Sequence, residues 1–439
     1  MQNLSNQPTI IPRSEHTISR SSINANALKV LYRLRQAEYG SYLVGGCVRD
    51  ILLGRHPKDF DVATDAHPEQ VRELFDNCRL IGRRFRLAHV LYGRDVIEVA
   101  TFRGYDAEDP SHDTENGRIL SDNVYGTIEQ DVWRRDFTVN ALYYNIADFS
   151  LIDYAGGLAD LNRRVIRLIG EPVQRYREDP VRMLRAVRFA AKLGFKIAEG
   201  TSAPIHELGY LLEDVPPARL FDETLKLFHT GHAIESFRLL REYGLMKYLF
   251  PALEQTLAGG GYPYALEFVQ QALANTDLRI QQEKSVTPAF LFAAFLWPPL
   301  IQAAGQGQET PVLYPMDLQR ASAALLARQC RHITIPRRFT AVMREIWLLQ
   351  SRLQRNVGKR ALGLLAHPRF RAAYDFLCLR AEAGENLRDY ADWWTEIQQK
   401  NPEERQHMLN VASSRHPGPR RRRPRKRRRS GVRHEKPSA

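Results

Sequence analysis

The sequence predicts an α+β protein in three successive parts: an α/β head of about 150 residues, an all-helical body and a disordered basic tail. Three observations support this division. Strand-like apolar runs follow one another between residues 42 and 102, and the last lies at 152–154. From Asp179 onward, apolar residues recur at helical spacing instead. Residues 415–439 carry most of the net charge.

Composition is ordinary for a soluble protein except at the C-terminal end. The 439 residues are 44% hydrophobic and 26% charged, with a net charge of +13. Residues 415–439 hold twelve Lys or Arg and one acid, Glu435, which leaves only +2 for the rest of the chain. Such a run repels itself and buries almost nothing apolar, so we expect disorder and attraction to a polyanion. A tail for solubility or partner docking is the alternative.

Cysteine and apolar patterns indicate a cytoplasmic protein without a membrane span. The four cysteines lie far apart, with no Cys-x-x-Cys pair, which argues against a disulfide framework or structural zinc. The longest apolar run, 288–300, is shorter than the ~20 residues that cross a bilayer and is interrupted by Pro298 and Pro299. The polar N-terminus lacks a signal core.

The head is expected to begin after a flexible arm, residues 1–21. Ser22 or Asn24 is suited to cap a helix over Ala27–Gln36, and Pro68 to open a short helix through Phe75. Residues 105–123, rich in Asp, Asn, Ser and Gly, predict a mobile loop. The predicted strands are Tyr42–Val44, Phe60–Ala63, Leu80–Ile81, Ala88–Tyr92, Val96–Phe102 and Ile152–Tyr154.

Amphipathic helices are predicted over Val181–Leu193, Arg219–Phe228 and Ala361–Ala383. The predicted boundaries are a head at 22–160, a helical neck at 161–230, a helical body at 231–410 and the Arg-rich tail at 411–439.

A glycine turn and a carboxylate pair carry the chemistry. Gly45 and Gly46 lie between a strand and a helix bearing Arg49, and glycine lets a backbone approach phosphate closely. Asp59 and Asp61 are spaced to project from one face of a strand. Paired carboxylates repel unless cations lie between them, and two metal ions assist phosphoryl transfer. An isolated Asp-x-Asp is more often a solvated strand end, but the nearby glycine turn favours function.

The run Gly45-Gly46-Cys47-Val48-Arg49-Asp50 with Asp59-Phe60-Asp61 resembles the head of class II nucleotidyltransferases of the polymerase β superfamily. That group holds bacterial poly(A) polymerases and CCA-adding enzymes. The resemblance implies a polymerase β-type head with a mixed sheet, two Mg²⁺ or Mn²⁺ ions on Asp59 and Asp61, and a triphosphate cradled by Gly45, Gly46 and Arg49.

The third acid has two candidates. Arg134-Arg135-Asp136-Phe137-Thr138-Val139-Asn140 resembles the family motif that closes over the nucleotide, which implies roles for Arg135 and Asp136. Glu98 lies in an apolar strand, where the superfamily often places its third carboxylate. The alternatives are an ion pair of Asp136 with Arg134 or Arg135, and an edge-strand position facing water for Glu98.

The neck carries Glu178-Asp179-Pro180-Val181-Arg182, followed by Arg185 and Arg188. Asp179 is suited to cap a helix with Pro180 in its first turn. The segment resembles the family's Glu-Asp-x-x-Arg motif, which implies that Asp179 and Arg182 read the Watson–Crick edge of the incoming base. A solvated basic helix face is the alternative for the arginines.

Residues 80–90 resemble the poly(A) polymerase version of the family, because arginines surround Phe85. Together with the tail, they form the predicted RNA-binding set. That set is Arg83, Arg84, Arg86, Arg420, Arg421, Arg422, Arg423, Arg425, Lys426, Arg427, Arg428 and Arg429.

The predicted activity is template-independent addition of AMP from ATP to RNA 3′ ends, with release of pyrophosphate. A role in RNA turnover is expected, with mRNA, small RNA or tRNA-like substrates and RNA-decay proteins as partners. The alternatives are a CCA-adding tRNA nucleotidyltransferase and a non-catalytic RNA-binding protein on the same fold.

Overall fold

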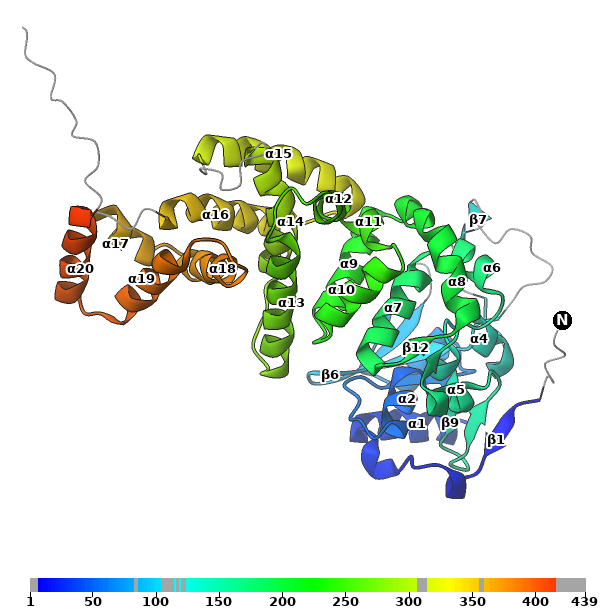
Figure 1. Cartoon of the computed structure of the whole chain (residues 1–439). Helices are drawn as coiled ribbons and strands as arrows, with labels where there is room; N and C mark the ends of the chain where they lie inside the picture. Colours follow the sequence, from blue (N-terminus) through cyan, green and yellow to red (C-terminus); the bar gives the residue numbers. More distant parts are fainter. Residues whose placement is uncertain are drawn as a thin grey trace, which may run out of the picture.

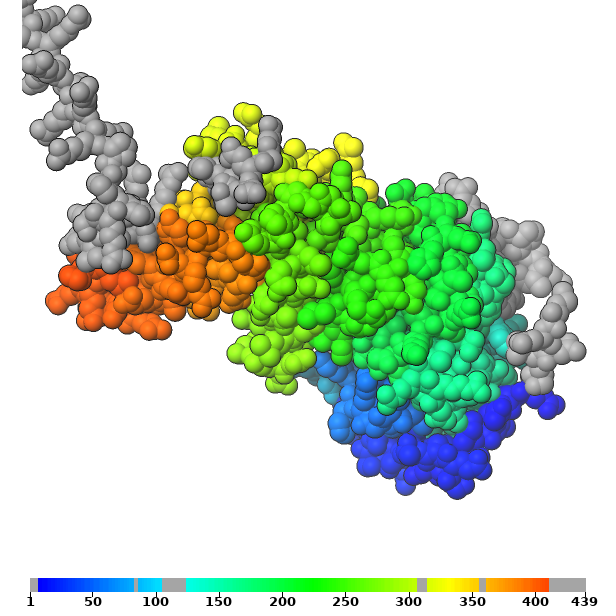
Figure 2. Space-filling model, viewed as in Figure 1, coloured from blue at the N-terminus to red at the C-terminus, as the bar shows by residue number. Residues whose placement is uncertain are grey.

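A computed structural model of the whole chain has a sheet-containing head from which a succession of helices extends (Figure 1). The space-filling view shows the same elongated arrangement, with the head at one end and the last helices at the other (Figure 2). The structure describes residues 7–82, 86–104, 124–305, 314–354 and 359–415, together with short strands at 114–115 and 118–119. The fold confirms the predicted α+β class.

The head is built on an eight-stranded sheet in the order β1-β10-β9-β2-β3-β6-β5-β4. The β3–β6 pairing is parallel and the other pairings are antiparallel, so the sheet is mixed, as predicted. Its strands are β1 (Thr9–Ile11), β2 (Ser41–Val44), β3 (Asp61–Thr64), β4 (Cys78–Ile81), β5 (Leu87–Tyr92), β6 (Asp95–Thr101), β9 (Leu142–Asn145) and β10 (Leu151–Asp153).

The described part of the predicted N-terminal arm belongs to the head. Strand β1 pairs with β10, from Thr9 opposite Asp153 to Ile11 opposite Leu151. Ile11 and Ile18 are buried in the main core. The expectation of a flexible arm over residues 1–21 is therefore wrong for these segments. The polar composition concealed a short apolar strand that covers one edge of the sheet.

Helix α1 (Ala25–Gln36) matches the predicted helix, with Asn24 as its cap. The Asn24 side chain accepts hydrogen bonds from the backbone N–H groups of Asn26 and Ala27, which lack partners within the helix. The buried face consists of Ala27, Val30, Leu31 and Leu34. The other head helices are α2 (Gly46–Leu52), α3 (Pro68–Leu74), α4 (Ile128–Arg134) and α5 (Gly157–Arg163).

Beyond the head the described chain is helical apart from β11 (Val165–Ile166) and β12 (Lys196–Ile197), which pair in parallel. Among the described residues, one continuous hydrophobic core runs from the head into the helices, a smaller core joins the last five helices, and a third small cluster lies in the head. The helices are α6 (Pro172–Glu178), α7 (Val181–Leu193), α8 (Glu199–Leu208), α9 (Pro217–Phe228), α10 (Ala233–Glu242), α11 (Met246–Leu249), α12 (Pro251–Gly259), α13 (Ala265–Gln281), α14 (Pro288–Gly305), α15 (Pro315–His332), α16 (Arg337–Leu353), α17 (Lys359–Leu365), α18 (Phe370–Glu382), α19 (Arg388–Gln399) and α20 (Pro402–Arg415).

Two helix predictions need correction. Helix α14 continues through Pro298 and Pro299, which were expected to interrupt the apolar run, because residues 291–301 are all buried and their packing offsets the lost hydrogen bonds. Within the described residues it is the one helix long and apolar enough to cross a membrane, and 67% of it is buried inside the protein. The predicted helix 361–383 is two helices, α17 and α18, separated by a turn that contains Pro368.

Candidate active site

The turn between β2 and α2 forms one wall of the site. Gly45 has φ +78°, a conformation that favours glycine. A Cβ atom built on Gly45 would lie 3.7 Å from a carboxylate oxygen of Asp61 and 3.7 Å from a guanidinium nitrogen of Arg135. The glycine therefore brings backbone without a side chain next to the Asp61 carboxylate of β3 and the Arg135 guanidinium, which follows α4.

Asp59 and Asp61 alternate with Phe60 as the sequence predicts. Phe60 is buried in the core, whereas Asp59 is exposed and Asp61 is half-buried. Neither carboxylate has a hydrogen-bond or ion-pair partner in the part of the chain that the structure describes. Burial raises the pKa of Asp61 to about 6, and the charges of Glu98 and Asp59 add to this while Arg135 opposes it. The pair thus has free lone pairs and excess negative charge.

Glu98 is the acid that the fold places beside Asp61. The two residues are register partners in the parallel β3–β6 pair and therefore project from the same face of the sheet. Strand β6 lies between β3 and β5, so the edge-strand alternative is wrong, although the Glu98 side chain does reach solvent. Its carboxylate lies 3.3 Å from the imidazole Nε2 of His89 on β5.

The carboxylates suit a hard divalent cation. Among the described residues no group of three or more His, Cys, Asp or Glu side chains is arranged to hold a metal ion. Mg²⁺ commonly binds through only one or two carboxylates and completes its shell with water and substrate phosphate oxygens. Two unpaired aspartates with a third acid on the neighbouring strand fit that pattern.

Asp136 has a different environment from the one expected. Its carboxylate accepts two hydrogen bonds from Arg185 on α7, one of them 2.8 Å long from Nε, and one of 3.2 Å from Asn140. The alternative of a pair with Arg134 or Arg135 is therefore wrong. Burial opposes ionisation of Asp136, but Arg185 and Asn140 outweigh it and hold its pKa at about 2. Because both oxygens of the Asp136 carboxylate already accept hydrogen bonds, this carboxylate has little capacity left to bind a metal ion.

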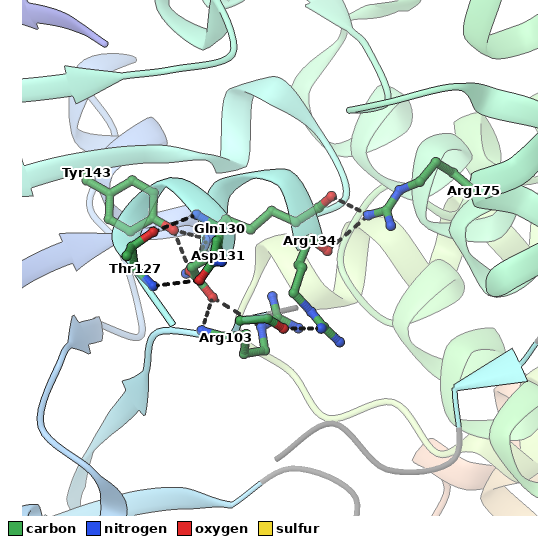
Figure 3. Close-up of polar contacts among 9 residues, drawn as sticks. Arg103, Thr127, Gln130, Asp131, Arg134, Tyr143 and Arg175 are labelled. Atoms are coloured by element: carbon green, nitrogen blue, oxygen red, sulfur yellow. Dashed lines mark hydrogen bonds and ion pairs between the residues drawn. The ribbon is translucent and has the colours of Figure 1, made fainter. Parts of the chain in front are cut away.

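Arg135 is fixed by a network that the sequence did not reveal. Asp131 accepts hydrogen bonds of 3.0 and 2.9 Å from Arg135, and others from the Tyr143 hydroxyl and from Arg103 (Figure 3). Burial alone would raise the pKa of Asp131, but the two arginines hold it at about 2. The backbone oxygens of Arg134 and Arg135 accept hydrogen bonds from Arg175 of α6.

The predicted base-reading residues begin at the junction of α6 and α7. Asp179 accepts a hydrogen bond of 2.8 Å from Arg219 and one of 3.2 Å from the backbone of Val181, which caps α7. The Arg182 guanidinium donates to Glu178 at 2.9 Å. Helix α7 spans Val181–Leu193, as predicted. Both side chains therefore have hydrogen-bond partners within the protein.

The arginines assigned to the nucleotide differ in exposure. Arg49 is 2% exposed, and it donates to Asp50 at 2.8 Å and to Asn140 at 2.5 Å. The prediction that Arg49 contacts the triphosphate is revised, because its nitrogens are already used inside the head. Arg185 and Arg188 of α7 are half-buried and lie nearer the surface.

Of the predicted RNA-binding residues, the structure describes Arg86 alone. It is exposed and pairs with Glu69 at 2.6 Å. Arg83, Arg84 and the tail residues lie outside the described part of the chain.

A mixed sheet with a glycine turn leading into a helix, beside a strand with unpaired carboxylates, defines a nucleotidyltransferase head of the polymerase β type. Three family profiles match the chain. "Poly A polymerase head domain" covers residues 41–167, "Probable RNA and SrmB- binding site of polymerase A" covers 194–257, and "Polymerase A arginine-rich C-terminus" covers 313–429.

Individual relatives agree with these profiles. Poly(A) polymerase I of Escherichia coli O6:H1 is 53% identical over 438 residues, which cover 97% of this chain and 94% of the relative. Poly(A) polymerase I of Haemophilus influenzae is 46% identical over 428 residues, with 95% and 94% coverage. Among solved structures, the Bacillus stearothermophilus CCA-adding enzyme in complex with CTP has a TM-score of 0.58 at 25% identity and covers 88% of this chain and 91% of its own.

The chain belongs to the bacterial poly(A) polymerase I family. The CCA-adding enzyme of Lactobacillus helveticus is more distant, at 37% identity over 217 residues, or 48% of this chain and 52% of the relative. The predicted template-independent polynucleotide adenylyltransferase is thereby confirmed over the CCA-adding and non-catalytic alternatives.

Proposed function

We propose that Asp59 and Asp61 hold the divalent cations for transfer of AMP from ATP to an RNA 3′ end, with Glu98 as the third acid. The observation that carries this proposal is the set of carboxylates on β3, just before β3 and on the adjacent β6, in which Asp59 and Asp61 have no partner among the described residues. The cations, two Mg²⁺ or Mn²⁺ ions, would supply charge neutralisation on the phosphates and acidify the attacking hydroxyl.

The reaction is a single displacement at the α-phosphorus of ATP. The 3′-hydroxyl oxygen of RNA forms a bond to that phosphorus, the bond to the oxygen bridging the α- and β-phosphates breaks, and pyrophosphate leaves. The hydroxyl proton passes to solvent. Gly45 brings bare backbone next to Asp61, and Arg135, held by Asp131 and Tyr143, adds a fixed positive charge there. No covalent enzyme intermediate is required.

We assign Asp136 and Arg49 supporting roles rather than contacts with metal or phosphate. Asp136 belongs to the head and Arg185 to α7, so their ion pair fixes the neck against the head. Arg49 holds Asn140, which in turn donates to Asp136. A displaced neck would misplace the base-reading residues, and small displacements of binding groups can cost large factors in rate.

Adenine would be recognised by Asp179 and Arg182, which offer an acceptor and a donor to its Watson–Crick edge. To do so, Asp179 exchanges its bond to Arg219 for a bond to the base. The proposed division of functions keeps the predicted boundaries except at the start of the head, which includes the described residues from 7 onward: head to 160 for catalysis, neck 161–230 for base recognition, body 231–410 and tail 411–439 for RNA. Cytoplasmic location and RNA-decay partners remain part of the proposal.

The test compares Asp59→Asn and Asp61→Asn with Asp65→Asn in the full-length protein. Asp65 follows the same strand, but it is exposed and accepts a hydrogen bond from the backbone of Gly40 at 2.8 Å, which asparagine can also accept. We expect the first two variants to lose nucleotide addition by a factor of at least ~10³ while still binding RNA, because several kcal/mol of transition-state stabilisation is removed. Asp65→Asn should stay near wild type. Normal turnover in either Asp59→Asn or Asp61→Asn would refute the metal assignment.

A further inference from the structure

Three arginines surround one phenyl ring where the head meets the neck. The guanidinium carbons of Arg49, Arg185 and Arg188 lie 5.3, 5.4 and 4.9 Å from the ring centre of Phe189. Arg185, Arg188 and Phe189 belong to α7, whereas Arg49 comes from α2 in the head. All three distances are within the ~6 Å over which a cation is attracted to an aromatic face.

The three cations differ in how their charge is balanced. Arg49 pairs with Asp50 at 2.7 Å, and Arg185 pairs with Asp136. Arg188 has neither a hydrogen bond nor an ion pair with any described residue, and its Nε atom is buried without a partner. Burial and the neighbouring charge of Arg185 lower the pKa of Arg188, although the carboxylates of Glu223 and Asp136 act in the opposite direction.

Like charges gathered at one ring repel one another, and flexible arginine side chains would normally separate into solvent. The negative face of the phenyl ring opposes this separation, because it attracts each cation. The ring therefore keeps Arg188 close to Arg185 without supplying a counter-charge. A cation held in this way retains its capacity to bind an anion.

We propose that Phe189 is a positioning residue for the triphosphate of ATP, because its ring holds Arg188, beside the Arg185–Asp136 ion pair, as a cation ready to bind an anion. This inference rests on the proposed nucleotidyl transfer and extends it to a residue that touches no substrate. The position favours a nucleotide phosphate, because Arg188 lies on α7 together with Arg182, and Asp179 comes two residues before that helix begins.

A purely structural role is the competing explanation. Phe189 also packs edge-to-face on Phe137, with ring centres 5.6 Å apart, so removal of its volume would disturb the core for reasons unrelated to charge. The test must therefore weaken the electrostatic character of the ring at nearly constant volume. Successive fluorination of the ring does this, because each fluorine withdraws charge from the aromatic face.

The experiment replaces Phe189 in the full-length protein with mono-, di- and trifluorophenylalanine and measures the binding of inorganic tripolyphosphate by calorimetry. The same series at Phe339 is the matched control, since Arg338 lies 4.8 Å from that ring on α16 and the ring packs on Phe221 of α9 rather than on α7. We expect the tripolyphosphate affinity to fall stepwise at Phe189, by about tenfold for the trifluoro residue, from a weakening of ~1 kcal/mol or more in the ring contacts. Adenosine affinity, melting temperature and the Phe339 series should not change.

Three other results would each overturn a separate part of the proposal. Equal tripolyphosphate affinity across the Phe189 series, with normal binding by the wild type, would overturn the role of Phe189 and leave the triphosphate site intact. Failure of the wild type to bind tripolyphosphate would overturn the triphosphate site itself. Arg188→Gln supplies a second readout: unaltered affinity in that variant would mean that Arg188 is not the anion-binding cation.

Discussion

Replacement of Asp136 by asparagine should destabilise the protein by about 2–3 kcal/mol at pH 7. An aspartate whose ordinary pKa is near 3.9 is held at about 2 here, and each pKa unit corresponds to ~1.4 kcal/mol. The side chain is only 12% exposed, so little of this is lost to solvent screening. Asparagine retains the shape but leaves Arg185 without its counter-ion.

The pH dependence follows from the sign of the shift. The folded-state pKa is depressed, so the stabilisation is fully present above the unfolded pKa near 3.9 and is lost as the pH falls through about 2. The difference in unfolding free energy between wild type and Asp136→Asn should therefore be constant from pH 7 to about 5. It should shrink steadily between pH 4 and 2.

Urea unfolding of wild type, Asp136→Asn, Arg185→Gln and the double variant at several pH values measures this directly. The double-mutant cycle should give a coupling energy of about 2 kcal/mol at pH 7 that decreases in acid. A destabilisation that is the same at pH 7 and pH 3, or additive effects of the two substitutions, would refute the ion-pair explanation.

Three further outcomes are expected. Gly45→Ala should lower the rate of nucleotide addition by at least about tenfold in a gel assay, because φ +78° is strained for alanine and the new methyl group faces Asp61; a normal rate would contradict the role of the turn. Arg337→Gln with Arg338→Gln, two exposed arginines at the start of α16, should raise the KM for RNA about two- to fivefold and leave the KM for ATP unchanged. Removal of residues 415–439 should flatten the slope of log affinity against log salt by roughly 4, if about six of its cations contact one strand; equal slopes would mean that the tail does not bind RNA.

Local signals account for the parts of the structure that the sequence predicted. The Gly45 turn and the alternation of Asp59, Phe60 and Asp61 depend on neighbouring residues alone. Helix α7 has the predicted bounds because its apolar positions and its C-terminal Gly194 are all local features. In such places propensity, capping and hydrophobic pattern agree.

Contacts between distant segments account for what the sequence did not reveal. Asp136 and Arg185 are 49 residues apart, and nothing in the local motif distinguishes Arg185 from Arg134 as the partner. Strand β9 was not predicted, because its short Leu-Tyr-Tyr run carries no clear local strand signal. Its burial depends on its position in the sheet between β10 and β2. The i, i+4 spacing of Asp131 and Arg135 was the one available signal for the network around Arg135.

The central claim, polyadenylation with ATP, is tested most directly by incubation of the full-length protein with an unstructured RNA, or with tRNA lacking its 3′ end, and each nucleoside triphosphate in turn. Product lengths are read on a gel. The account predicts long homopolymeric tails with ATP alone and little extension with CTP alone. Products on tRNA that stop after addition of C, C and A, with no extension of the unstructured RNA by ATP, would contradict it.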